Sequence, residues 1–354
     1  MTDQAIRALR LSRQRLTEPV ADRDDFLALF RLMQPVKPIA FSCPGDPPSL
    51  FPRCALGDAR FTQPLRAART LIKGRFQGGL IGYILADELP LYAAVYRRPC
   101  DLTDPLLGRL YELIEREGPL TIGQIKETTG MLVKEITPAL QKLQQAFLVY
   151  EDQTDCDWER GFYALAREFP QIETLPPKAD ALTVLLTRLF EAAVFCDPAG
   201  LQSATGLSKR ELSAATGALE AAGLLLPCVF EGTAGFVRRE DAALLAALSD
   251  ARPTPSVFVL HLSDFLVKCS APSLKKRFPG ANALQYLLID GSFAGVVTGK
   301  WRQGPHEIWD ILTTLPAEEA EARREELLGA VRAVYPHLPE KDYSLSAAGA
   351  GTLG

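Results

Sequence analysis

Residues 105–150 read PLLGRLYELIEREGPLTIGQIKETTGMLVKEITPALQKLQQAFLVY, a pattern that predicts a helix, a short helix, a third helix and a strand. Residues 181–230 read ALTVLLTRLFEAAVFCDPAGLQSATGLSKRELSAATGALEAAGLLLPCVF and repeat this order at an offset of 76 residues. Three helices followed by a β-hairpin are typical of a winged helix, a variant of the helix-turn-helix. The sequence therefore predicts two winged-helix modules in tandem.

Local signals support these helix boundaries. A Thr-Gly pair ends the short helix of each unit, at Thr129-Gly130 and at Thr205-Gly206. Glycine adopts the left-handed backbone that commonly terminates a helix, because it has no Cβ to clash. Ser208, with Glu211 three residues later, has the pattern of a capping box at the start of the next helix.

The third helix of such a unit is the element that contacts the duplex in helix-turn-helix proteins. Its candidate DNA-binding residues are Lys134 in the first unit and Lys209 and Arg210 in the second. A turn at Glu231-Gly232-Thr233 predicts the hairpin of the second wing. The first wing is acidic and would repel phosphates, so that unit either touches DNA less or serves as a packing module.

The charge is unevenly distributed, although the net charge is only −4. Residues 1–100 carry 15 Lys and Arg against 9 Asp and Glu, whereas residues 101–200 carry 9 against 17. A basic N-terminal part would attract a polyanion such as double-stranded DNA. Alternatively, many of these basic residues lie on ordinary solvent-exposed helix faces and have no role in binding.

The stretch TQPLRAARTLIKGRF, residues 62–76, holds the best candidates for phosphate contacts. On a helix, Arg66, Arg69 and Lys73 would fall along one stripe, with Arg75 close by. We predict that these four side chains bind DNA phosphates. The same spacing also fits an ordinary solvent-exposed helix face without a role in binding.

Beyond about residue 254 the pattern changes to strands. Runs rich in β-branched and aromatic residues are SVFVLHL (256–262), DFLVKCS (264–270), LQYLLI (284–289), SFAGVVTG (292–299) and HEIWDILTT (306–314). Asp290-Gly291 is a strong two-residue hairpin signal, and a helix over about 316–333 would close the sheet.

The expected fold class is α+β, mainly α, with tandem winged-helix domains followed by a small C-terminal antiparallel β-sheet or partial barrel. The expected domains are a basic helical or winged-helix-like domain at 1–100, winged helices at 101–178 and 179–250, a β-rich domain at 254–340 and a flexible tail at 345–354.

Composition argues against several classes of site. The seven cysteines include no C-x-x-C pair and the three histidines have no metal-ligand spacing, so no metal is expected. Neither a P-loop nor a G-x-G-x-x-G pattern occurs, so no nucleotide cofactor is expected. Without a run of about 18 apolar residues or a signal peptide, we expect no membrane contact and a cytoplasmic protein, nucleoid-associated when bound to DNA.

The sequence resembles the winged-helix DNA glycosylases of the AlkZ and YcaQ type, which remove alkylated bases and unhook interstrand crosslinks. The stretch RTLIKGRFQGGLIGYILADELPLYAAVYR, residues 69–97, is similar to that family's basic strand leading into an A-x-D-L-P helix start. Here Gln77-Gly78-Gly79-Leu80 replaces the usual R-G-T-L. The resemblance covers most of the chain and implies a DNA repair enzyme that needs no cofactor.

The family's catalytic signature is a glutamine, an apolar residue, then a glutamine or aspartate, just after the second N-terminal helix. The corresponding residues here are Gln34-Pro35-Val36, so Gln34 matches the catalytic position and Val36 replaces the second polar residue. An amide can orient a water molecule, whereas valine cannot. Alternatively, Gln34 only ends a helix and caps a backbone group.

Two classes of DNA-binding function therefore remain open, beside a third reading in which the winged helices form a scaffold that binds only protein. The first is a monofunctional DNA glycosylase that excises alkylated or crosslinked bases and leaves an abasic site. The second is a non-catalytic DNA-binding protein, such as a transcription regulator or damage sensor. Lys37 would suit the imine-forming nucleophile of a bifunctional enzyme, but nothing in the sequence indicates that its pKa is lowered.

Overall fold

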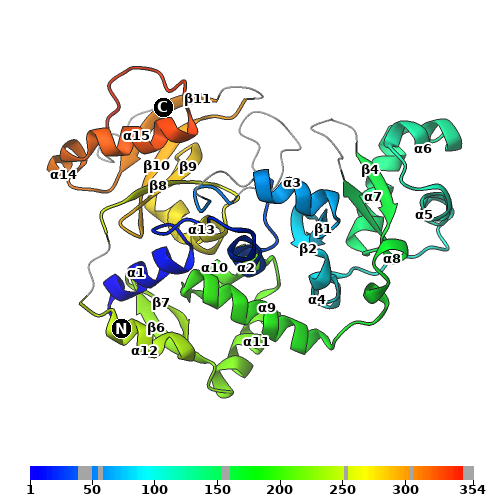
Figure 1. Cartoon of the computed structure of the whole chain (residues 1–354), viewed down its shortest axis with the longest axis horizontal. Coiled ribbons are helices and arrows are strands. Elements are labelled where there is room, and N and C mark those ends of the chain that lie inside the picture. Colours follow the sequence, from blue (N-terminus) through cyan, green and yellow to red (C-terminus); the bar gives the residue numbers. More distant parts are fainter. Residues whose placement is uncertain (39–49, 55–58, 153–159, 251–253, 303–305, 346–354) are drawn as a thin grey trace.

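The computed structural model describes residues 1–354 except 39–49, 55–58, 153–159, 251–253, 303–305 and 346–354 (Figure 1). Its α-helices are α1 (Asp3–Arg13), α2 (Arg23–Met33), α3 (Ala59–Ala67), α4 (Leu89–Tyr96), α5 (Pro105–Glu117), α6 (Ile122–Thr129), α7 (Val133–Gln145), α8 (Leu165–Glu168), α9 (Lys178–Ala193), α10 (Pro198–Thr205), α11 (Lys209–Ala221), α12 (Ala242–Ala247), α13 (Phe265–Arg277), α14 (Ala317–Ala322) and α15 (Arg324–Val334). Its strands are β1 (Leu71–Gln77), β2 (Leu80–Leu85), β3 (Val149–Asp152), β4 (Gly161–Ala164), β5 (Phe195–Cys196), β6 (Leu225–Phe230), β7 (Thr233–Arg238), β8 (Val257–His261), β9 (Ala283–Ile289), β10 (Ser292–Lys300) and β11 (Glu307–Thr313).

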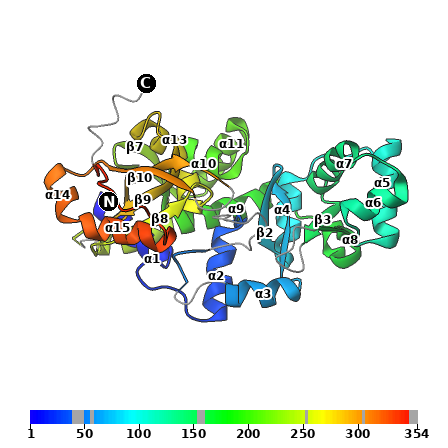
Figure 2. The same ribbon diagram turned by 90° about the horizontal axis from the view of Figure 1, so that it is seen from above.

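The fold mixes helices with antiparallel sheets. Within the described ranges the sheet orders are β2-β1-β3-β4, β5-β7-β6 and β11-β10-β9-β8. Along the longest axis, α5, α6 and α7 lie at one end and the C-terminal sheet with α14 and α15 at the other (Figures 1 and 2). Helices α2, α9, α10 and α13 lie between these ends (Figures 1 and 2). None of the described helices is long and apolar enough to cross a membrane.

The two repeated stretches form the helices that their patterns predict. The first gives α5, α6 and α7 followed by β3, and the second gives α9, α10 and α11 followed by β6. Gly130 and Gly206 both end the short helix in the left-handed conformation, at φ values of 71° and 70°. The predicted capping box of Ser208 and Glu211 is present at the start of α11.

The predicted helical stripe of Arg66, Arg69 and Lys73 is wrong. Helix α3 ends at Ala67, Arg69 has a φ of 56°, and the chain continues as strand β1. One edge of β1 pairs with β2 through the turn at Gly78-Gly79, and the other edge of β1 pairs with β3. Cross-strand pairing therefore overrides the helical spacing, and the sheet extends across the boundary expected at residue 100.

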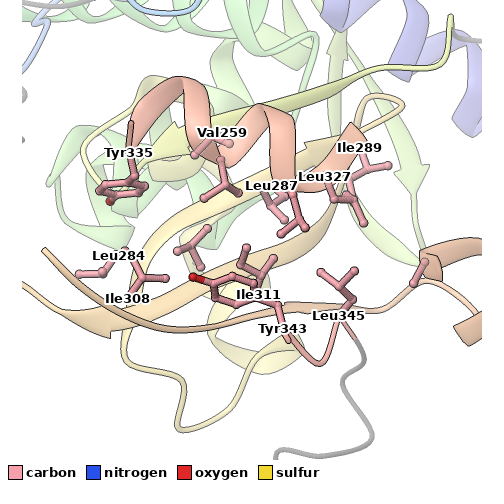
Figure 3. Packing of buried hydrophobic residues seen from close by; sticks show 14 of the residues in the cluster. Val259, Leu284, Leu287, Ile289, Ile308, Ile311, Leu327, Tyr335, Tyr343 and Leu345 are labelled. Carbon is pink, nitrogen blue, oxygen red and sulfur yellow. The ribbon is translucent and has the colours of Figure 1, made fainter. Parts of the chain in front are cut away.

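The C-terminal sheet forms around the hairpin predicted at Asp290-Gly291, which joins β9 to β10. Helix α15 packs on one face of the sheet through Leu327 and Val331. Buried side chains from the strands, from α15 and from the chain after it fill the space between them (Figure 3). This cluster stabilises the C-terminal part through burial of apolar surface.

Three details at this end differ from the predictions. The stretch 264–270, expected as a strand, begins α13, because Asp264 caps the helix by accepting a hydrogen bond from the Leu266 amide. A short apolar run does not distinguish a buried strand from a helix. The closing helix is split at Arg323 into α14 and α15. The tail cannot start at 345, since Leu345 is buried in the C-terminal cluster; residues 346–354 lie outside the described ranges.

Candidate functional site

A cleft opens where α2, α4, α9, α10 and α13 converge. It holds about 870 Å³ of empty space, including its open mouth. Its walls include the segment Gln34–Lys37, Tyr92 and Tyr96 of α4, and Phe265 and Lys268 of α13. The lining also includes leucines and Arg188 of α9 and the last residues of α10. We call this cleft the Gln34 pocket.

Gln34 is held by contacts with β2 and α4. Its side-chain Oε1 accepts a hydrogen bond from the Leu85 amide at 2.8 Å, and its backbone carbonyl accepts one from the Tyr92 hydroxyl at 2.8 Å. Because Leu85 donates, the orientation of the Gln34 amide is defined. Its Nε2 is buried and has no hydrogen-bond partner among the described residues. The unsatisfied group at the pocket wall is therefore a donor.

Val36 occupies the second polar position of the signature but supplies no polar side chain there. Its backbone forms a bridge with Tyr83, and its side chain packs in the apolar cluster of Phe30, Leu50 and Leu85. Only 7% of Val36 is exposed. The second position of the signature therefore contributes packing to the pocket wall and no hydrogen bond.

Two tyrosines of α4 form an aromatic wall. The rings of Tyr92 and Tyr96 are stacked, with centroids 6.2 Å apart. Burial raises the pKa of both hydroxyls, that of Tyr96 to about 12. Both therefore stay protonated at neutral pH and can donate hydrogen bonds.

Two arginines at the pocket wall are neutralised by Glu88, which is buried. Arg188 of α9 contacts Glu88 Oε2 at 2.5 Å, and Arg31 of α2 contacts Oε1. Arg31 also contacts Asp87 at 2.8 Å. This ion cluster joins α2, the start of α4 and α9, and it fixes one side of the pocket.

The pocket's carboxylate, Asp264, is also fully engaged. Arg53 is completely buried and binds Asp264 through both terminal nitrogens, at 2.7 and 3.1 Å. Gln14 accepts two further hydrogen bonds from Arg53, at 3.0 and 2.8 Å. Asp264 therefore serves to join the N-terminal part to α13, and it is not free to act as a base.

Lys37 and Lys268 contrast with these paired cations. Neither makes an ion pair within the described part of the chain, and Lys37 Nζ is shielded from solvent without a hydrogen-bond partner. Burial and the charge of Lys268 lower the pKa of Lys37 to about 8. Burial also lowers the pKa of Lys268.

The residues predicted to contact DNA fall into two groups. Arg66 and Arg69 form ion pairs with Asp152 at 3.3 and 2.6 Å, and buried Lys73 contacts Glu151 at 3.2 Å. Arg75 is half-buried and donates to the Gly79 carbonyl. The acidic residues of β3 thus neutralise much of the basic charge on which the phosphate prediction relied.

The second group is exposed. Lys134 lies in the first turn of α7, and Lys209 and Arg210 begin α11. None of the three makes an ion pair with another described residue. These three side chains are available to bind phosphates, but the structure does not bring them into the Gln34 pocket.

A family model described as DNA glycosylase AlkZ-like matches residues 86–303. The chain belongs to the AlkZ-like DNA glycosylase family. Membership supports a role in DNA binding and repair. The matched stretch supplies the pocket walls from α4, α9, α10 and α13, but it does not include Gln34.

A solved structure described as the Streptomyces sahachiroi DNA glycosylase AlkZ is similar to this chain. The TM-score is 0.66 and the identity 15%, with 93% of this chain and 96% of that chain covered. At this identity the likeness concerns the fold. Among curated proteins, none matches the chain.

The sequence could not assemble this pocket from spacing. Tyr92, Arg188 and Lys268 lie about 80 to 100 residues apart on three helices, and each is typical of an ordinary helix face. Gln34 could be found because the family signature follows the second helix. No local signal marked the other side chains.

Proposed function

We propose that this protein is a DNA glycosylase that hydrolyses the N-glycosidic bond of an alkylated or crosslinked base in duplex DNA. Water is the nucleophile, the product is an abasic site, and no cofactor takes part. The base occupies the Gln34 pocket. The stretches 101–178 and 179–250 act as winged-helix modules that hold the duplex.

The observation that carries this proposal is the combination of Gln34 with a concave, cation-lined pocket. A glycosylase must accept a base turned out of the duplex, whereas a regulator needs only a helix that fits a groove. The stacked tyrosines offer a base an aromatic surface, and the buried Nε2 of Gln34 offers a hydrogen bond. Family membership points to the same activity.

The chemistry of the pocket favours a base that is already a good leaving group. Asp264 is bound by Arg53, so no described pocket carboxylate is free to stabilise a cationic sugar or to deprotonate water. An N7- or N3-alkylated purine carries a positive charge and leaves as a neutral molecule. Gln34 then needs only to position the water, through the donor Nε2.

Contact with the duplex is assigned to the third helices of the two modules. Lys134 on α7 and Lys209 and Arg210 on α11 are exposed cations at the N-terminal ends of their helices. The N-terminus of a helix also attracts phosphate through its unpaired amides. We propose these three residues as the phosphate contacts, in preference to the paired cations around β1.

The test is release of free base from a duplex that contains one N7-methylguanine. Wild-type protein should liberate N7-methylguanine, and abasic sites should appear in equal amount. Val36→Gln should accelerate the release, because its amide would restore the second polar group at the pocket wall. Since this change buries an amide, thermal unfolding must be compared to confirm that the variant is folded.

The burial of Val36 in an apolar cluster favours a second candidate, a protein that binds altered DNA without cutting it. In that case wild-type protein would bind the methylated duplex and release no base. A folded Val36→Gln variant that is equally inactive would support this second candidate and contradict the first.

A further inference from the structure

Lys37 is a charged residue of the Gln34 pocket whose position the proposed hydrolysis does not explain, and its Nζ, unlike that of Lys268, is buried without a hydrogen-bond partner among the described residues. Arg31 and Arg188 share Glu88, and Asp264 has Arg53 as its partner. The ammonium of Lys37 has no such partner in the described ranges, although its Nζ is shielded from solvent. Burying an unpaired charge is costly, so a protein without a use for this amine would gain by replacing it.

The backbone directs Lys37 to a defined place. The bridge between Val36 and Tyr83 holds this segment extended, so that the side chains of Pro35 and Lys37 lie on the face opposite to Val36. Both pack over Gly82, where an added Cβ would lie 3.0 Å from Pro35 Cβ and 3.4 Å from Lys37 Nζ. The absence of a side chain at Gly82 therefore makes room for the amine beside the cleft.

The protonation of this amine suits a nucleophile. Burial lowers the pKa of Lys37 to about 8, and Lys268 on α13 adds repulsion. A large fraction of the side chain is thus neutral at slightly alkaline pH, whereas an exposed lysine is almost entirely protonated there. Only the neutral amine has the lone pair that attacks a carbonyl carbon.

We propose that Lys37 captures the aldehyde of an abasic deoxyribose as an imine. This inference rests on the proposed function, because base release produces that sugar next to the same pocket wall. Base release itself remains a reaction of water. Capture follows when the four-carbon stem of Lys37 turns toward the sugar.

The step balances without a cofactor. The ring of the abasic sugar opens to an aldehyde at C1′, and the lone pair of Nζ forms a C–N bond to this carbon. The carbinolamine takes up one proton and loses one water molecule, which leaves a protonated imine. Addition of water reverses the sequence and restores both the amine and the aldehyde. Capture would hold the protein on a reactive product until that hydrolysis.

Reductive trapping tests the inference. A duplex with one abasic site, made by removing uracil from a uracil-containing strand, is incubated with full-length protein and sodium cyanoborohydride. The reductant converts the imine to a stable secondary amine, so a covalent protein–DNA band should appear on a denaturing gel. Peptide mapping of the wild-type adduct should place the modification on Lys37.

Two substitutions test whether trapping requires the amine of Lys37. Lys37→Arg keeps the charge but should abolish the adduct, because a guanidinium stays protonated. Lys276→Arg makes the same change at an exposed position of α13 and should leave trapping unchanged. Equal melting temperatures would show that Lys37→Arg is folded, and the mapping of the wild-type adduct does not depend on either variant.

The outcomes separate this inference from the function on which it rests. An absent adduct, an adduct on Lys268 or the N-terminal amine, or full trapping by a folded Lys37→Arg variant would overturn imine capture. If the same protein still releases N7-methylguanine, the glycosylase proposal stands. Trapping on Lys37 without any base release would contradict the glycosylase proposal alone.

Discussion

Gln34 combines a structural contact with the group proposed to act on substrate. Its Oε1 satisfies the buried amide of Leu85, while its Nε2 has no partner among the described residues. The alternative that Gln34 caps a backbone group is therefore confirmed in part, although that group belongs to β2, and its catalytic role stays a proposal. The residue could be found from the sequence, but the strand that it contacts depends on the tertiary fold.

A substitution at Gln34 should affect both stability and rate. Gln34→Ala leaves the Leu85 amide unsatisfied and should cost ~1–3 kcal/mol of unfolding free energy. It should also slow base release by roughly 10²-fold, the range expected for one positioned polar group. Denaturant unfolding and single-turnover release of N7-methylguanine measure the two effects.

The isosteric change Gln34→Glu is the matched control. The carboxylate still accepts from Leu85 but cannot donate from the position of Nε2. We expect Gln34→Glu to be closer to wild type than Gln34→Ala in stability, but as slow in base release. If Gln34→Glu releases base at the wild-type rate, Nε2 has no role.

His261 gives the region beside the pocket a dependence on pH. Its Nδ1 accepts a hydrogen bond from the Ser263 amide at 3.1 Å, which requires the neutral ring. Burial lowers the pKa of His261 to about 4. The positive charges of His306 and Lys268 also lower this pKa, whereas the negative charge of Asp264 raises it in part. The unfolded chain therefore binds the proton more readily than the folded one.

The contribution of His261 to stability should be complete above about pH 6.5 and should fall as the pH drops toward 4. The loss should reach ~3 kcal/mol near pH 4. His261→Asn keeps an acceptor for the Ser263 amide without titrating, so its unfolding free energy should fall less over this range. Denaturant unfolding at pH 7, 5.5 and 4 measures the difference, and parallel curves for both proteins would contradict the assignment.

At the level of elements, the repeat was the most informative feature of the sequence. Helical periodicity, the Thr-Gly pairs and the capping box of Ser208 define boundaries that local physics sets, and the structure has these helices. The predictions of a helix that continues beyond Ala67 and of a strand over 264–270 are wrong, because pairing with β2 and capping by Asp264 decide the structure there. Such interactions are not visible in local spacing.

The same sheet explains why the basic charge of the N-terminal part is misleading. Strand β1 carries Lys73, strand β3 carries Glu151, and the two residues face each other in the pairing register. Charges counted separately for residues 1–100 and 101–200 cancel across this sheet. A cation that is paired and buried in the protein releases few counterions when DNA binds.

The exposed cations of α11 should therefore dominate the salt dependence of DNA binding. The double change Lys209→Gln and Arg210→Gln should flatten the log–log slope of affinity against salt by about 0.9 for each phosphate that is no longer neutralised. Fluorescence anisotropy with an unmodified duplex at several salt concentrations measures the slope.

The adjacent pair Lys275 and Lys276 on α13 provides a control with the same change in charge, since both residues are exposed. Changing both to glutamine should leave the slope nearly unchanged. If the two double variants flatten the slope equally, overall charge and not α11 determines binding.

At the scale of the whole molecule, the Gln34 pocket exists because distant segments are tied together. Arg53 joins Gln14 in the N-terminal part to Asp264 at the start of α13, and Glu88 joins α2 to α9. Composition and spacing could predict helices and the C-terminal sheet, and the family resemblance supplied one catalytic candidate. They could not predict which side chains converge, because these ties join residues that are far apart in the sequence, up to 211 positions in the pair Arg53–Asp264.

The most direct test of the central claim is to fill the pocket. Ala204 lines it at the end of α10, so Ala204→Phe should place a ring where the base would sit. Ala322→Phe adds the same ring at an exposed position of α14. Single-turnover release of N7-methylguanine from duplex DNA should be abolished in Ala204→Phe and unchanged in Ala322→Phe, with equal duplex affinity in both. A folded Ala204→Phe variant that releases the base at the wild-type rate would contradict the claim that the base occupies this pocket.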